Sequence, residues 1–171
     1  MTKIRPDIHI SNDYQIPGFN REEVFEAGCD SRLWPSLDKM KFNYLDQNPR
    51  LKQFGQISLQ LTLDSLPRQL AKFRNVHMNG QIDQFETGKQ ILISGQTPGL
   101  AGLKIDLSFH DNRHLEDEDL ATTIHYETNI ELRNLLVRKL GKSILVSSLN
   151  VYVPGFCEQY RDNVITKLNQ A

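Results

Sequence analysis

Residues 56–63 read QISLQLTL and alternate strictly between polar and apolar side chains. Every second residue from Ile57 to Leu63 is a large aliphatic one, and the residues between them are Gln, Ser or Thr. A period of two predicts a β-strand with one buried face and one face in water. Such strands are typical of an antiparallel sheet that covers a core on one side only.

The same alternation recurs along most of the chain. It is seen at 39–45, 76–82, 91–93, 103–109 and 124–132, and a shorter run with Ile8 and Ile10 precedes them. Segments rich in turn-forming residues separate these runs at 46–49, 86–89, 96–99 and 111–119. With no repeat and no long linker, the pattern predicts one domain over 1–171, built on a single curved antiparallel sheet of about six to seven strands.

Two short helices are expected between the first and second strands. Asn20 and Glu23 have the spacing of a capping box, which predicts a helix at 21–27. Asp30 is placed to cap a second helical turn at 31–34.

The C-terminal segment 144–168 predicts one long amphipathic helix. Large apolar residues recur there at intervals of three and four: Leu145, Leu149, Tyr152, Phe156, Tyr160, Val164 and Leu168. Pro154 lies within the pattern, so a kink or a break is expected at that point. A curved sheet closed by one long helix is an α+β fold.

The order of strand, two short helices, about six strands and long helix resembles the helix-grip fold of the START-like (SRPBCC) superfamily of polyketide cyclases, dehydrases and lipid-transport proteins. Residues 20–25, NREEVF, resemble the opening helix of that superfamily, and 29–37, CDSRLWPSL, resemble the turn that follows it. The glycine-punctuated strands at 80–95 and 102–109, with ATTIHYET at 121–128, resemble the carbon monoxide dehydrogenase G-like branch.

The resemblance implies a cavity between the sheet and the long helix that holds an apolar small molecule or lipid. Its expected walls combine aromatic rings, hydroxyl groups and a flexible thioether: Trp34, Phe42, Tyr44, Met78, Tyr126, Tyr152 and Phe156. Gly80 falls on an inward row, where it leaves either a gap for a ligand or a bend in the sheet.

No catalytic, metal or cofactor site is expected. Residues 141–143, GKS, end like a phosphate-binding loop, but Leu136 stands where the first glycine of that loop is required. His110 and His114 flank a turn with acidic residues at 111 and 116–119, which favours a charged hairpin tip over a metal site. Cys29 and Cys157 are expected to be small buried hydrophobic residues.

Composition excludes several classes of protein. The formal net charge is −1, whereas nucleic-acid binders are usually basic. No stretch approaches the roughly 20 apolar residues of a membrane-spanning helix. The N-terminal residues have no apolar signal core, and two cysteines cannot form a disulfide framework, so a cytoplasmic location is expected.

Three functions remain open from the sequence. The first is non-catalytic binding of an apolar molecule. The second is a protein-interaction or membrane-surface module, for which 133–142 combines Arg133, Arg138, Lys139 and Lys142 with four aliphatic residues and directly follows a fifth, Leu132. That segment is also consistent with a loop that leads into the long helix and packs on the sheet, which we prefer. The third, an enzyme of the cyclase or dehydratase kind, would need an inward carboxylate or histidine, and the inward rows contain none.

Overall fold

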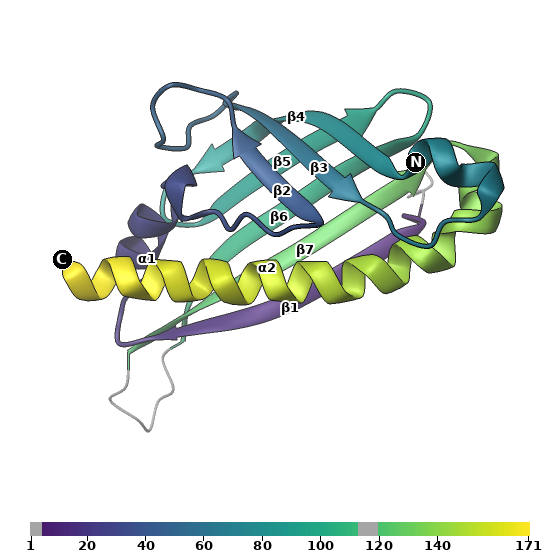
Figure 1. The fold of residues 1–171 in the computed structure, drawn as a ribbon. Coiled ribbons are helices and arrows are strands. Elements are labelled where there is room, and N and C mark those ends of the chain that lie inside the picture. The colour runs from purple at the N-terminus through teal and green to yellow at the C-terminus, as the bar shows by residue number, and fades with distance from the viewer. Residues whose placement is uncertain (1–4, 113–119) are drawn as a thin grey trace.

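A curled antiparallel sheet wraps around one long helix in the computed structural model, which describes residues 5–112 and 120–171 (Figure 1). In the described residues the sheet has seven strands in the order β1-β7-β6-β5-β4-β3-β2. They are β1 (Ile8–Pro17), β2 (Met40–Tyr44), β3 (Gln56–Thr62), β4 (Asn75–Glu86), β5 (Gln90–Thr97), β6 (Ala101–Asn112) and β7 (Ala121–Leu132). The predicted α+β helix-grip architecture is confirmed.

The alternation read from the sequence sets which residues face the helix. Ile57, Leu61 and Leu63 are buried, whereas Gln60 is exposed. On β6 and β7 the inward residues lie opposite one another, in the pairs Leu103–Ile130, Ile105–Thr128, Leu107–Tyr126 and Phe109–Ile124. Because a slip of one residue would turn every apolar side chain outward, burial on one face fixes this register.

Both predicted short helical segments are present. Asn20 accepts a hydrogen bond from the backbone N–H of Glu23 at 2.9 Å, and the Glu23 carboxylate accepts one from the backbone N–H of Asn20 at 2.9 Å. This capping box starts α1 (Arg21–Gly28). The side chain of Asp30 caps the 3₁₀ turn η1 (Ser31–Leu33).

The first strand is longer than predicted. The sequence indicated only a short run around Ile8 and Ile10, but β1 continues to Pro17 and pairs with β7 along its full length. Asn12 and Asp13 have low strand propensity, which conceals the continuation. Backbone pairing with β7 outweighs that local preference.

Helix α2 (Lys142–Gln170) runs unbroken through Pro154, so the predicted alternative of a break there is wrong. Proline removes one helical hydrogen bond to the carbonyl group four residues earlier, which belongs to the exposed Asn150 and can bind water. The buried stripe of α2 is also displaced by one residue in its middle. Val153 and Cys157 are buried, whereas the predicted Tyr152 and Phe156 are half-buried.

The segment 133–142 does lead into the long helix, as we preferred, but most of it is helical and not a loop. Residues 135–136 are helical, and the π-helical turn η3 (Val137–Gly141) leads directly into α2. Only Val137 and Gly141 of η3 are buried. Gly141 lies against Leu70 of η2 (Arg68–Phe73), a 3₁₀ segment that was not predicted.

Candidate functional site

An apolar cavity lies between the inner face of the sheet and α2. Its walls include Met40 and Phe42 of β2, Leu59 and Leu61 of β3, Leu103 and Ile105 of β6, and Leu145, Leu149 and Val153 of α2. At one end of the molecule it reaches Leu66, Leu70 and Phe73 around η2 and Val137 of η3. The cavity volume is about 60 Å³. That space holds a few water molecules but is smaller than the roughly 150 Å³ of an engineered cavity that binds benzene.

Three of the seven predicted wall residues line this cavity. Phe42 comes from the edge strand β2, Met78 from β4 and Tyr126 from β7. Met78 and Tyr126 are buried, whereas Phe42 is half-buried. The structure therefore brings together residues from three separate strands, as their inward positions indicated.

The other four predicted wall residues lie outside the cavity lining. Trp34 and Tyr44 form an aromatic cluster with Phe42, because the ring centroid of Trp34 lies 6.2 Å from that of Phe42 and 6.1 Å from that of Tyr44. Phe42 in turn lies 5.2 Å from the ring of Phe156 on α2. The cluster joins the edge strand β2 to the helix, so it closes the side of the grip. Tyr152 is half-buried at the margin of the core.

The wall residues from α2 and η2 are not among those predicted from the sequence. Leu145 and Leu149 belong to the predicted helix stripe but not to the predicted cavity wall, and no helical segment is predicted at η2. Leu70 and Phe73 are spaced by three after Pro67, which is typical of a helical turn that begins at proline. That spacing was the signal available for η2.

Gly80 marks a close approach between strands and not a gap for a ligand. A Cβ atom at this position would lie 2.3 Å from the backbone oxygen of Ser94 and 3.0 Å from the Cα atom of Gly95. Gly80 pairs with Gly95 across β4 and β5, and the register of these strands shifts just beyond, between Ile82 and Gln84. The absence of a side chain at Gly80 therefore allows the sheet to bend, which is the second of its two predicted roles.

The cavity presents few polar groups. The Thr128 hydroxyl donates to the backbone oxygen of Lys104 at 3.2 Å, which satisfies that donor. Burial raises the pKa of the Tyr126 phenol, and a hydrogen bond with the Thr128 side chain offsets only part of that rise. Tyr126 thus stays protonated at neutral pH, and its hydroxyl oxygen can still accept a hydrogen bond at a largely apolar wall.

The surroundings of the two cysteine thiols disfavour the thiolate form. Both are buried and free, as predicted. Burial raises the pKa of Cys29 to about 12 and that of Cys157 to about 11. Because the thiolate is the nucleophilic form, neither group is activated at neutral pH.

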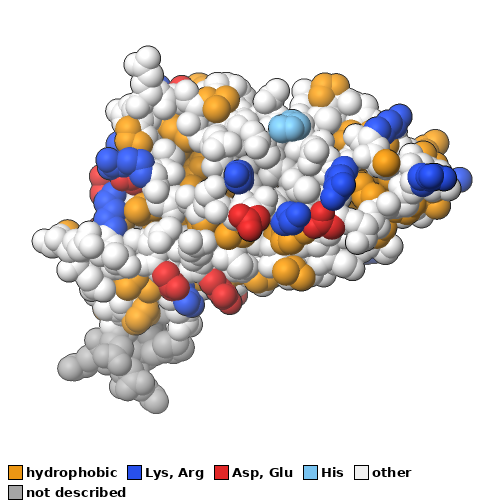
Figure 2. Space-filling model, viewed as in Figure 1, with side chains coloured by type: hydrophobic (Ala, Val, Ile, Leu, Met, Phe, Trp, Pro, Cys, Tyr) orange, Lys and Arg blue, Asp and Glu red, His pale blue; other side chains and the backbone are white. Residues whose placement is uncertain are grey.

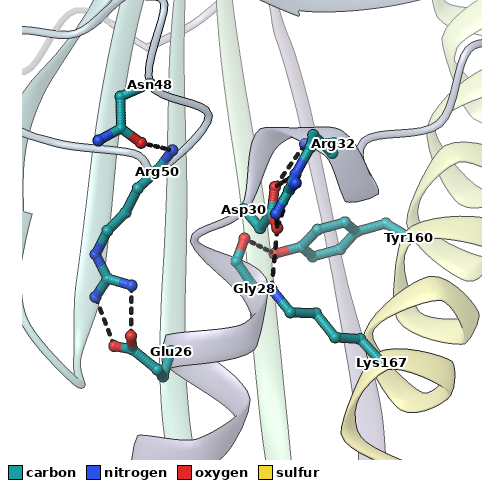
Figure 3. A network of polar contacts seen from close by, with 8 residues as sticks. All are labelled: Glu26, Gly28, Asp30, Arg32, Asn48, Arg50, Tyr160 and Lys167. Carbon is teal, nitrogen blue, oxygen red and sulfur yellow. Dashed lines mark hydrogen bonds and ion pairs between the residues drawn. The ribbon is translucent and has the colours of Figure 1, made fainter. Parts of the chain in front are cut away.

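A polar network holds the other end of α2 against α1 and η1 (Figure 3). The Tyr160 hydroxyl donates to the backbone oxygen of Gly28 at 2.7 Å. Lys167 Nζ lies 3.0 Å from Asp30 Oδ2, and Arg32 Nε donates to Asp30 Oδ1 at 2.9 Å. These hydrogen bonds, with that from Arg32 the strongest, hold the pKa of the Asp30 carboxyl well below its usual range. All these groups have partners, so the network positions the helix.

Within residues 5–112 and 120–171, no three His, Cys, Asp or Glu residues lie close enough together to hold a metal ion. His125 faces the outer side of the sheet, where its Nδ1 lies 2.6 Å from Asp13 Oδ1. His114 and the acidic residues 116–119 of the predicted hairpin tip lie outside the described residues. None of the described helices is both long and apolar enough to cross a membrane.

Comparisons with known proteins show similarity in structure but none in sequence. No family model and no curated protein matches the chain. A protein from Thermus thermophilus is 12% identical, with a TM-score of 0.61 over 94% of this chain and 99% of its own. A Staphylococcus aureus protein of unknown function is 15% identical, with a TM-score of 0.55 over 96% and 98%.

A third similar structure is that of a named enzyme. The ZhuI aromatase/cyclase of a Streptomyces species is 9% identical, with a TM-score of 0.55 over 95% of this chain and 94% of its own. At these identities the likeness shows the fold alone. With the seven-stranded sheet and the long helix described above, these similarities establish that the chain has an α+β helix-grip fold.

Proposed function

We propose that the protein binds a small apolar molecule in the cavity between the sheet and α2, without catalysing a reaction on it. The observation that supports this is the chemistry of the cavity wall. Every residue that lines it is aliphatic, aromatic, a methionine, a glycine or Thr128. Charged residues do not occur among the lining residues. A wall of this kind selects ligands by apolar contact.

Binding of a ligand larger than the cavity requires the cavity walls to move apart. A cavity of about 60 Å³ cannot accommodate a lipid chain without movement of its walls. Met40 and Met78 lie in the wall, and methionine changes rotamer at low cost. The Tyr126 hydroxyl oxygen can accept one hydrogen bond, which fits a ligand with a single polar group.

We also propose the nearest relatives of the protein and its cellular location. The carbon monoxide dehydrogenase G-like branch is our proposal for the nearest relatives, and it rests on the strand motifs at 80–95, 102–109 and 121–128. The cytoplasmic location is supported by the two free cysteines, because thiols persist in reducing compartments.

Filling the cavity tests the proposed function. Ala101 is buried and lines the cavity, so Ala101→Leu places three additional carbon atoms in the empty space. We expect the affinity for an environment-sensitive fatty-acid probe to fall about tenfold or more, with a change in unfolding free energy of under about 1 kcal/mol. Fluorescence titration and urea denaturation measure the two quantities.

Ala27→Leu is the matched control. Ala27 is also buried but lies in α1, outside the cavity lining. It should destabilise the protein by about 1–3 kcal/mol through overpacking and leave the affinity for the probe unchanged. Equal probe affinity in the parent protein and in Ala101→Leu would contradict the proposal.

A further inference from the structure

The segment that leads into α2 exposes apolar side chains to an unusual degree. Leu135, Leu136 and Leu140 are 66%, 42% and 43% exposed. They account for three of the seven large hydrophobic residues that are exposed in the described part of the chain. Single exposed apolar residues are ordinary, but three within six positions form a patch.

Basic residues surround these leucines. Lys139 and Lys142 are exposed in the same segment, and Arg68 and Lys72 are exposed on the neighbouring η2. None of these four cations takes part in an ion pair among the described residues, whereas Arg133 and Arg138 pair with Glu131 and Asp7. We name Arg68, Lys72, Leu135, Leu136, Lys139, Leu140 and Lys142 the basic–apolar patch.

The patch occupies one end of the molecule. Gly141 packs against Leu70, which brings η3 and η2 side by side. Figure 2 shows basic and hydrophobic side chains adjacent to one another at that end. The patch is therefore carried by the tip of the molecule and not by a groove.

We propose that the basic–apolar patch docks on an anionic membrane surface. Unpaired lysine and arginine side chains are attracted to acidic headgroups by about fivefold in affinity each. Exposed leucines next to such cations enter the boundary between headgroups and acyl chains. Projecting leucines on a tip fit a soft lipid surface better than a preformed protein pocket.

The cavity reaches the same end of the molecule. Leu70 and Val137, which line it, belong to η2 and η3. Docking would therefore place this end of the cavity at the lipid surface. Only the significance of this placement for ligand binding rests on the proposed function, because the patch can bind lipid whether or not the cavity holds a ligand.

Co-sedimentation with vesicles tests the docking. The probes are phosphatidylcholine vesicles with and without phosphatidylserine. We expect the protein to bind only the vesicles with phosphatidylserine, and binding to weaken as salt is raised. Lys139→Glu combined with Lys142→Glu should reduce binding by about 25-fold or more. The triple variant Leu135→Ser, Leu136→Ser and Leu140→Ser should abolish vesicle binding.

Two controls match these variants. Lys41→Glu with Lys104→Glu changes the net charge by the same amount at exposed sites outside the patch. Val151→Ser removes an apolar side chain that is 69% exposed on α2, also outside the patch. Both should bind vesicles like the parent protein, and all variants should bind the fatty-acid probe equally in solution.

Equal losses in the patch variants and in the controls would overturn the proposal. So would a parent protein that binds neither kind of vesicle, and an acidic protein surface would then be the partner that the patch fits. A parent protein that binds vesicles but no fatty-acid probe would support docking and count against the proposed function.

Discussion

Leu149→Ala should destabilise the protein by about 2–5 kcal/mol and at the same time strengthen its binding of an apolar probe. Leu149 is buried on α2 and lines the cavity. Removing three carbon atoms loses apolar burial, which accounts for the loss of stability. The same change enlarges a cavity that is too small for most ligands, and so lowers the cost of admitting one. Urea denaturation and probe titration measure the two effects.

Leu51→Ala separates the two effects. Leu51 is also buried, but it lies outside the cavity lining. The same chemical change should therefore destabilise the protein without any gain in probe affinity. A similar gain in both variants would mean that the probe responds to loosened packing in general, and would contradict the cavity as the site.

Asp30→Ala should destabilise the protein by about 2–4 kcal/mol near neutral pH. Asp30 is only 8% exposed and accepts hydrogen bonds from Arg32 and Lys167. It also caps η1 through the backbone N–H of Arg32 at 3.0 Å. The substitution removes the cap and leaves two cations without their partner. Both cations reach solvent in part, which keeps the loss at the lower end of values for buried ion pairs.

The effect of Asp30 should depend on pH with a defined sign. Because its pKa is lowered on folding, its contribution is fully present above the ordinary carboxyl pKa of 3.8 and is lost as pH falls through the lower, folded value. The difference in unfolding free energy between the parent protein and Asp30→Ala should be constant above about pH 5 and shrink below about pH 4. Denaturation midpoints across this range measure it, and a difference that grows in acid would refute the ion-pair account.

Much of the fold could be predicted because its strands have one buried face and one face exposed to solvent. The period of two at 56–63 and 103–109 determines both the strands and their orientation. The capping residues Asn20 and Asp30 identified the two short helical segments in the same direct way. These signals are local, so the sequence carries them explicitly.

The candidate site was harder to predict because its walls depend on how α2 rests on the sheet. Two apolar stripes compete on that helix, one through Tyr152 and Phe156 and the other through Val153 and Cys157. Only the packing of the sheet decides that the second is buried. The close approach at Gly80 depends likewise on the backbone of β5, which no local pattern reveals.

The most direct test of the cavity as a ligand site is nuclear magnetic resonance of the methionine methyl groups. The chain has three methionines, and two of them, Met40 and Met78, line the cavity. During titration with decanoic acid, we expect the methyl signals of Met40 and Met78 to shift together and to saturate, and Ala101→Leu to suppress both shifts. Unchanged Met40 and Met78 signals at saturating decanoic acid would contradict the account.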